Sequence, residues 1–385
     1  MRNLFKQIGV FLLSAAFGAV TMALYMSGSR YLGIQPPGWF TIFAILFVII
    51  VLAVAIHEAG HFIAGKAVGL KFYMLSVGPV KFQLRGERIR LELNKNLNMV
   101  GGLTIMLPEI GQFKETESAQ FWYLAGGIIA NIITSIMLFV LVAVLIFNSL
   151  VLPESLLTYT LYTTAFINML IGVTALIPSN SGALESDGTQ LFDLHRGGIK
   201  SVIKQRIMAL LVSIWNGGRP REMNKAEIDN LLELTQSNTD SNALSIRLLA
   251  FGYHLDNGEI DLAESFLDEV IECVKQQKNI MIEGTVYSEK AFVLAAFRRD
   301  SETAQLFLDK AKKGYTEEFT IAKAEAAILL LNSKIEEAID RAKEGLIAAE
   351  ESISKGSSVF EIEMLTALSN GKLPDLKQAN QNAVG

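Results

Sequence analysis

Residues 39–64, WFTIFAILFVIIVLAVAIHEAGHFIA, decide the fold of this chain. The stretch exceeds the length of about 20 apolar residues that an α-helix needs to cross the hydrocarbon core of a bilayer. It carries no charge until position 58, where a glutamate stands between histidines at 57 and 61. Because ionisable side chains at membrane depth are costly, His57, Glu58 and His61 are predicted to have a function.

Three further apolar stretches predict that this segment is one helix of a membrane bundle. They comprise residues 7–29, 119–150 and 155–178, and each is long enough to span a bilayer. The first is longer than the apolar core of a typical signal peptide, so we expect it to remain as an uncleaved helix. The predicted fold class is therefore mostly α, with a polytopic transmembrane bundle of about four spans.

Charge separates the chain into two halves. Of its 385 residues 51% are hydrophobic, and the mean hydropathy of +0.35 is high for a soluble protein. Residues 1–218 carry 15 Lys and Arg against 10 Asp and Glu, whereas residues 219–385 carry 19 against 29. The first half is predicted to lie in the membrane and the second to be soluble. The acidic balance of the second half argues against a nucleic-acid partner.

The placement of Lys and Arg predicts the orientation. Positive charge is concentrated at the N-terminus, in the loop 65–118 and after the last span, which predicts that these parts lie in the cytoplasm. The chain is then a multi-pass protein of the cell membrane, and HEAGH lies near the cytoplasmic end of its span.

The loop 65–118 contains a predicted β-hairpin. In KFQLRGERIRLELN (81–94) apolar and charged residues alternate on both sides of the Arg85-Gly86-Glu87 break, which gives a hairpin with one apolar face. A strand-like run follows at 100–108. The hairpin is either a plain structural element or an edge to which an extended substrate strand is added.

The spacing of the two histidines predicts a zinc site. Residues four apart on a helix lie on one face, so His57 and His61 can hold the same ion. Glu58 lies beside that face, where it can take a proton from water, as in the H-E-x-x-H pattern of metalloproteases. The alternative is two histidines hydrogen-bonded inside a helix bundle. Gly60, between them, is predicted to let another backbone approach closely.

A catalytic zinc ion takes three protein ligands, so a third is required. Four residues follow the last span on the same side of the membrane, namely Glu185, Asp187, Asp193 and His195. Asp187 leads on position, because Gly188 after it suits an abrupt turn that would present the carboxylate. The other three remain open at this point.

The residues quoted above resemble the site-2 protease family of intramembrane zinc metalloproteases, over roughly residues 38–195. LAGGIIAN (124–131) is similar to the family's Ala-Gly-x-x-x-Asn helix, and Asp187-Gly188 is similar to its Asp-Gly signature. The sequences VGP (77–79) and VGG (100–102) agree as well. The resemblance implies a zinc endopeptidase with His57, His61 and Asp187 as ligands and Glu58 as general base.

One family feature is missing from this chain. Many members have Asn-x-x-Pro shortly before the Asp-Gly, but Ala175 stands three residues before Pro178 here. In the family that asparagine helps to hold the substrate, so the resemblance implies that its role is either taken by Asn131, Asn168 or Asn180 or lost. The implied substrate is a transmembrane or membrane-adjacent segment of a protein or peptide. The candidates for this substrate-binding role are Asn131, Asn168, Gly101 and Gly102, with Asn180 as a further asparagine.

The predicted domains are a membrane-embedded metalloprotease domain (1–215), a linker (216–223), a helical domain (224–369) and a disordered tail (370–385). Residues 200–215 are either an interfacial helix or the first helix of the soluble domain.

The helical domain resembles a degenerate array of tetratricopeptide-like repeats, with a generic helical bundle as the alternative. Ala263, Ala304 and Ala338 occupy equivalent places, at intervals of 41 and 34 residues, and 34 is the tetratricopeptide period. Such arrays bind partner proteins, so we expect one on this cytoplasmic domain. His254 is interpreted as an ordinary helix residue and Cys273, the single cysteine, as a small buried side chain.

Two functions from different classes follow. The first is a zinc-dependent intramembrane endopeptidase, and the alternative is a zinc-bearing membrane scaffold without proteolysis that recruits partners through its helical domain. The presence of Glu58 favours the first, since a scaffold has no need of a general base.

Overall fold

The structure is a computed structural model that describes residues 2–85, 88–93, 101–108, 116–178, 180–181, 184–215, 218–277, 280–314, 316–350 and 355–376. The chain divides into two compact units, Met1–Ala64 with Tyr123–Ile177, and Gly65–Trp122 with Pro178–Gly385. Residues 377–385, most of the predicted disordered tail, lie outside the described residues. The predicted domain limits remain predictions.

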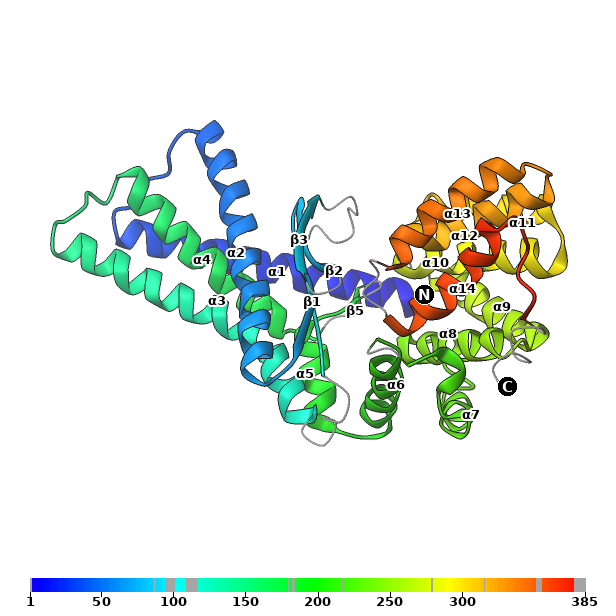
Figure 1. Ribbon diagram of the computed structural model, residues 1–385. Helices are drawn as coiled ribbons and strands as arrows, with labels where there is room; N and C mark the ends of the chain where they lie inside the picture. The colour runs from blue at the N-terminus through cyan, green and yellow to red at the C-terminus, as the bar shows by residue number, and fades with distance from the viewer. Residues whose placement is uncertain are drawn as a thin grey trace. The chain divides into compact units, whose positions relative to one another are not determined.

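Long helices form the first unit (Figure 1). They are α1 (Arg2–Tyr31), α2 (Trp39–Ala67), α3 (Thr116–Phe147) and α4 (Leu156–Leu176). Among the described residues, three helices are long and apolar enough to cross a membrane, and these are α2, α3 and α4. Three of the predicted spans are thus confirmed as apolar helices, whereas a span within α1, and with it the count of four, remains a prediction.

Many large apolar side chains of α2 and α3 are exposed. Phe43, Phe47 and Met137 are 69%, 70% and 66% exposed. Apolar surface of this extent is unfavourable in water and favourable in lipid, as expected of a membrane protein. Because lipid offers no hydrogen bonds, every backbone polar group must be satisfied inside the helices or by caps. At the start of α4 the Ser155 hydroxyl accepts from the Thr158 N–H at 3.2 Å.

Helices α2 and α3 cross at glycines. A Cβ added to Gly60 would lie 2.4 Å from the Gly126 carbonyl oxygen, and one added to Gly126 would lie 2.5 Å from the Ala64 Cβ. Ala130, one turn beyond Gly126, lies against Gly60 as well. Small residues four apart on both helices let the backbones touch, which is how membrane helices pack without a hydrophobic driving force. The predicted role of Gly60 is confirmed.

A four-stranded antiparallel sheet belongs to the second unit. Its strands are β1 (Lys71–Val77), β2 (Val80–Arg85), β3 (Arg88–Leu93) and β4 (Leu103–Leu107), in the order β3-β2-β1-β4. The predicted hairpin is confirmed as β2–β3, and the predicted run at 100–108 contains β4. Strand β1, which occupies a central position, has no counterpart among the predicted elements.

The β2–β3 hairpin has the predicted amphipathic character. Phe82 pairs with Leu91 on one face, where they are 40% and 67% exposed. Lys81 pairs with Glu92 on the other face, and their side chains form an ion pair of 2.9 Å. Strands β3 and β4 are the two edges of the sheet.

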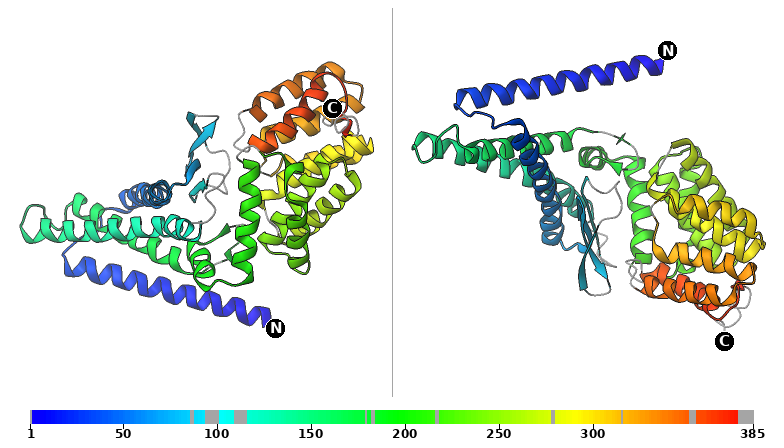
Figure 2. Two further views of the ribbon diagram at one scale, coloured as in Figure 1. Left: turned by 60° about the horizontal axis from the view of Figure 1, so that its bottom comes forward. Right: turned by 90° about the horizontal axis from the view of Figure 1, so that it is seen from above.

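Short elements and a helical array complete the second unit (Figure 2). They are β5 (Asn180–Ser181), β6 (Leu184–Glu185), α5 (Asp187–Arg196), α6 (Ile199–Trp215), the 3-10 helix η3 (Pro220–Glu222), α7 (Lys225–Leu234), α8 (Ser241–Asp256), α9 (Ile260–Gln277), α10 (Ile280–Val293), the π-helix η4 (Leu294–Arg298), α11 (Ser301–Ala311), α12 (Glu318–Leu331), α13 (Ile335–Glu350) and α14 (Lys355–Ser369).

Helix α6 is the first helix of this array. Its Ile203 and Ile207 are buried in one hydrophobic cluster with Ile228 of α7 and Ile246 of α8. This packing corresponds to the second of the two expectations for residues 200–215.

The segment expected to be a linker is held in place by an arginine. The Arg219 guanidinium donates to both carboxylate oxygens of Asp256 on α8, at 2.7–2.9 Å, and to Glu363 on α14 at 2.6 Å. Asp256 is 1% exposed, so this bidentate pair is desolvated and directional. The start and the end of the array are thereby tied together.

Successive helices of the array pack in pairs, α8 with α9, α10 with α11 and α12 with α13. Ala263, Ala304 and Ala338, the residues in equivalent places, are all fully buried. The likeness to tetratricopeptide repeats remains a prediction. His254 is bound to the Glu259 carboxylate within the same unit, and Cys273 is half-buried.

A buried charge network connects the last helices. Lys323 of α12 is fully buried and donates to Glu289 of α10 at 3.0 Å and to Glu361 of α14 at 2.9 Å. Its ammonium also lies 4.5 Å from the centre of the Phe292 ring. Burial raises the pKa of Glu361 to about 7, because desolvation and the charge of Glu289 outweigh the attraction of Lys323.

This network predicts a pH-dependent stability of the array. The pKa of Glu361 is raised above its ordinary value of 4.5, so the folded array binds this proton more tightly than the unfolded chain does. The resulting contribution to the free energy of unfolding is fully present below pH 4.5 and is lost as pH rises through about 7. Hydrogen exchange of α14, corrected for intrinsic rates, should show protection falling between pH 5 and 8. The Glu361→Gln variant should lose most of this dependence; an identical profile in the variant would contradict the assignment.

Candidate metal centre

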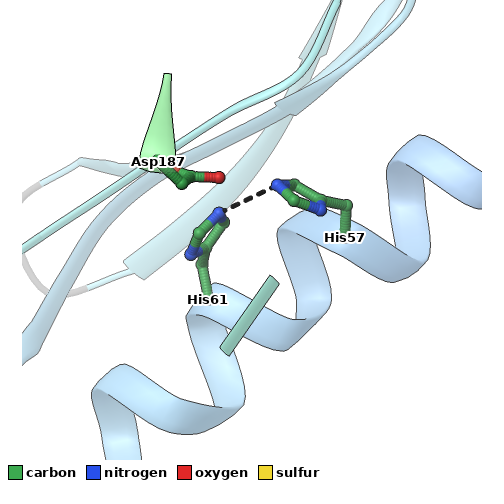
Figure 3. Close-up of side chains that lie close together, drawn as sticks. All are labelled: His57, His61 and Asp187. Atoms are coloured by element: carbon green, nitrogen blue, oxygen red, sulfur yellow. Dashed lines mark hydrogen bonds between the residues drawn. The ribbon is translucent and has the colours of Figure 1, made fainter. Parts of the chain in front are cut away.

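Three potential metal ligands lie together in the structure. The ligand atoms of His57, His61 and Asp187 are all within 4.8 Å of one another. Figure 3 shows the Asp187 carboxylate pointing toward the two imidazoles, which project from neighbouring turns of α2. His57 and His61 are 9% and 5% exposed. The predicted one-face geometry of the two histidines is therefore present.

Nδ1 of His57, the ring nitrogen on the side away from the other histidine and here called its outer nitrogen, faces an acceptor. It lies 2.8 Å from Oδ1 of Asn131, on α3. The Asn131 amide nitrogen donates to the carbonyl oxygens of Ala53 and Asn168, at 3.0 and 2.9 Å. Its NH₂ group is thus used on two acceptors, and only its oxygen can face the histidine. His57 Nδ1 must then carry the proton and donate it to Asn131.

The outer nitrogen of His61 is fixed in the same way. Its Nδ1 lies 2.7 Å from the backbone carbonyl oxygen of Tyr123, which can only accept. The proton of a neutral His61 is therefore on Nδ1 as well.

The inner nitrogens face each other. His57 Nε2 and His61 Nε2 are 3.2 Å apart, the contact drawn as a dashed line in Figure 3. In neutral rings with the proton on Nδ1, both inner nitrogens carry lone pairs, which can bind a cation together with the Asp187 carboxylate. Two imidazoles with outer N–H groups held by oxygen acceptors are the usual arrangement of zinc-ligating histidines.

Glycine 127 makes room for the imidazoles. A Cβ at this position would lie 2.5 Å from His61 Nε2 and 2.9 Å from His57 Cε1. Any side chain here would displace both rings, so Gly127 forms the floor of the site. The sequence places it in LAGGIIAN, next to the Gly126 that makes the helix crossing.

Asp187 is presented by a helix start. It is the first residue of α5, whose N-cap is Ser186, with the Ser186 hydroxyl accepting from the Thr189 N–H at 3.2 Å. The abrupt turn expected at Gly188 is therefore wrong, because the serine cap begins a helix there. A carboxylate in the first turn is stabilised by the helix dipole.

The other candidates for the third ligand are placed differently. Glu185 pairs with Lys204 at 3.1 Å, and Lys204 also donates to Gln190. Asp193 is half-buried and His195 is exposed. Within the described part of the chain, none of the three joins the group formed by the two histidines.

Glu58 follows His57 on α2 and is 5% exposed. Its role as general base stays a prediction.

Two of the four predicted substrate-binding residues form hydrogen bonds inside the helix bundle. Asn131 and Asn168 are fully buried and bonded to each other, and Asn131 holds His57. Gly101 is exposed, and Gly102 has a φ of 100°, a conformation that favours glycine. Substrate binding by all four stays a prediction.

Comparison with known proteins gives one match. Residues 44–151 match Peptidase family M50. That family, which includes the site-2 proteases, consists of zinc-dependent metallopeptidases. The match contains HEAGH and Asn131 and ends before Asn168 and Asp187, and it supports a membrane metalloprotease. No curated protein and no solved structure matches the chain.

The donor set fits zinc. Two imidazole nitrogens and one carboxylate are a known ligand set of catalytic zinc, which keeps one further position open. The residues are therefore compatible with a zinc ion.

The floor residue gives a test of the site. Gly127→Ala places a methyl group where the imidazoles lie, so we expect the purified protein to lose bound zinc by at least tenfold. Zinc per protein, measured by elemental analysis, decides this. Gly38→Ala, at a glycine with open space around it, is the matched control and should keep its zinc. Full zinc content in Gly127→Ala would contradict the geometry.

Proposed function

We propose that the protein is a zinc-dependent intramembrane endopeptidase that cleaves a transmembrane or membrane-proximal segment of a protein or peptide. The observation that carries the proposal is the group of His57, His61 and Asp187, whose ligand atoms all lie within 4.8 Å of one another. The match of residues 44–151 to a peptidase family supports it.

The residues have distinct roles in this reaction. A zinc ion held by His57, His61 and Asp187 would supply Lewis acidity to the scissile carbonyl and to the attacking water. Glu58 takes a proton from that water on its carboxylate and later delivers it to the leaving amine. Asn131 and the Tyr123 carbonyl keep both imidazoles oriented throughout.

The substrate segment must be extended, since an intact helix hides its carbonyl groups. The sheet offers edge strands β3 and β4 to which such a segment can add as a further strand. The exposed apolar face of the β2–β3 hairpin suits an apolar substrate. A purely structural role of the hairpin remains the alternative.

The proposal includes a location and a partner. We place the protein in the cell membrane as a multi-pass chain with its N-terminus and helical domain in the cytoplasm, on the basis of the Lys and Arg distribution. The helical array is proposed to bind a protein partner. A non-proteolytic zinc-bearing scaffold is the second candidate function; the buried Glu58 beside the ligands favours the peptidase.

The base can be removed without disturbing the ligands. We expect Glu58→Gln to retain zinc and to abolish cleavage, with a rate loss of at least 10²-fold, the usual contribution of a general base. Membrane proteomics of cells that carry wild type or Glu58→Gln should reveal uncut substrates that accumulate only in the variant. If the purified variant still cuts such a substrate at the wild-type rate, the peptidase proposal fails.

The third ligand has a separate test. Asp187→Asn removes the negative charge and should lower zinc affinity about 10–100-fold. Asp193→Asn, at a carboxylate outside the group, is the control and should bind zinc as wild type does. Equal zinc affinity in wild type and Asp187→Asn would contradict Asp187 as the third ligand and would favour Glu185, Asp193 or His195 instead.

A further inference from the structure

Asn168 lies in the middle of the membrane helix α4 and is fully buried. A buried amide in such a helix is costly unless both ends are hydrogen-bonded. Its Nδ2 donates to the Thr164 carbonyl oxygen, one turn earlier, at 2.8 Å. The Thr164 oxygen can only accept, so the Asn168 amide is oriented with its oxygen toward Asn131 on α3.

The orientation of the Asn168 amide determines that of the Asn131 amide. Asn168 Oδ1 accepts from Asn131 Nδ2 at 2.9 Å, and the Ala53 carbonyl oxygen on α2 accepts from the same nitrogen at 3.0 Å. A carboxamide has nearly the same shape when turned by half a revolution, so its orientation is decided by its partners. Two acceptors on one side require the nitrogen there and leave the Asn131 oxygen toward His57.

The last step concerns the proton of His57. With the Asn131 oxygen at 2.8 Å, Nδ1 holds the proton and the lone pair is on Nε2. If the Asn131 amide turned, its NH₂ would face Nδ1, and the proton would move to Nε2, where it blocks metal binding.

We propose that Asn168 is a positioning residue of the metal centre: through the Asn131 amide it keeps the His57 proton on Nδ1 and the lone pair on Nε2, the nitrogen that faces Asp187. The inference rests on the proposed zinc site and extends it to a helix that neither the HEAGH motif nor the matched region 44–151 includes. The chain of amides runs across α4, α3 and α2, so zinc affinity depends on how α4 packs.

Three variants of the full-length protein test the proposal. Asn168→Leu keeps the volume but removes the acceptor for Asn131. Asn168→Asp, in its neutral form, offers an oxygen acceptor to Asn131 and an O–H donor to Thr164. Thr163→Val removes another buried polar contact of α4, the hydrogen bond to Tyr25, which has no link to His57.

Two measurements are made on each purified protein. Competition with a zinc-binding dye gives the affinity, and ¹⁵N spectra of the metal-free protein give the imidazole tautomers. The chain has only four histidines, and a His57→Asn sample identifies the signals of His57. We expect Asn168→Leu to lose about 10–100-fold in zinc affinity, as outer partners of ligands do, and to shift His57 toward the Nε2–H form.

Asn168→Asp and Thr163→Val should keep the wild-type tautomer and an affinity within about threefold of wild type. Unchanged affinity and tautomer in Asn168→Leu would overturn the proposal, as would an equal loss in Thr163→Val, which would indicate a general packing effect. A wild-type protein that binds no zinc would overturn the proposed function, whereas the tautomers would still decide the role of Asn168.

Discussion

The rest of this site depends on which nitrogen of His57 and of His61 carries the proton. His57 and His61 each have an oxygen acceptor at Nδ1, so both Nε2 atoms face inward with lone pairs, 3.2 Å apart. The two atoms lie on the side of the rings that faces the Asp187 carboxylate.

That constraint requires close helices. The Tyr123 carbonyl and Asn131 are both on α3, and they reach the histidines because α2 and α3 cross at Gly60 and Gly126, where a single methyl group would prevent contact. Gly127 leaves the space that the two rings fill. Two adjacent glycines of α3 thus have different roles. Gly126 allows backbone contact with α2, and Gly127 leaves space for the imidazole rings.

Much of this could be predicted from the sequence. HEAGH, its span and the pairing of β2 with β3 follow from spacing and alternation, which are local. Strand β1 was missed because its residues are buried on both faces, so alternation is absent. The turn expected at Gly188 is a helix start in the structure, because Ser186 is a good N-cap residue and Asp187 is an acidic residue of the first turn. Both are helix-start signals that the sequence contains.

Other features depend on partners distant in sequence. Arg219 looked like part of a linker, and only the fold brings Asp256, 37 residues later, to its guanidinium. The partner of Asn131 is likewise 74 residues away, which no periodicity reveals. These contacts arise from packing between elements rather than from patterns within one element.

The central claim is that His57, His61 and Asp187 bind zinc through nitrogen and oxygen alone. Zinc X-ray absorption of the purified full-length protein tests it directly. The account predicts one zinc ion per chain, with two imidazole nitrogens at about 2.0–2.1 Å, oxygen atoms in the remaining positions and no sulfur. A protein that carries no stoichiometric zinc, or a zinc shell with fewer than two imidazoles, would contradict it.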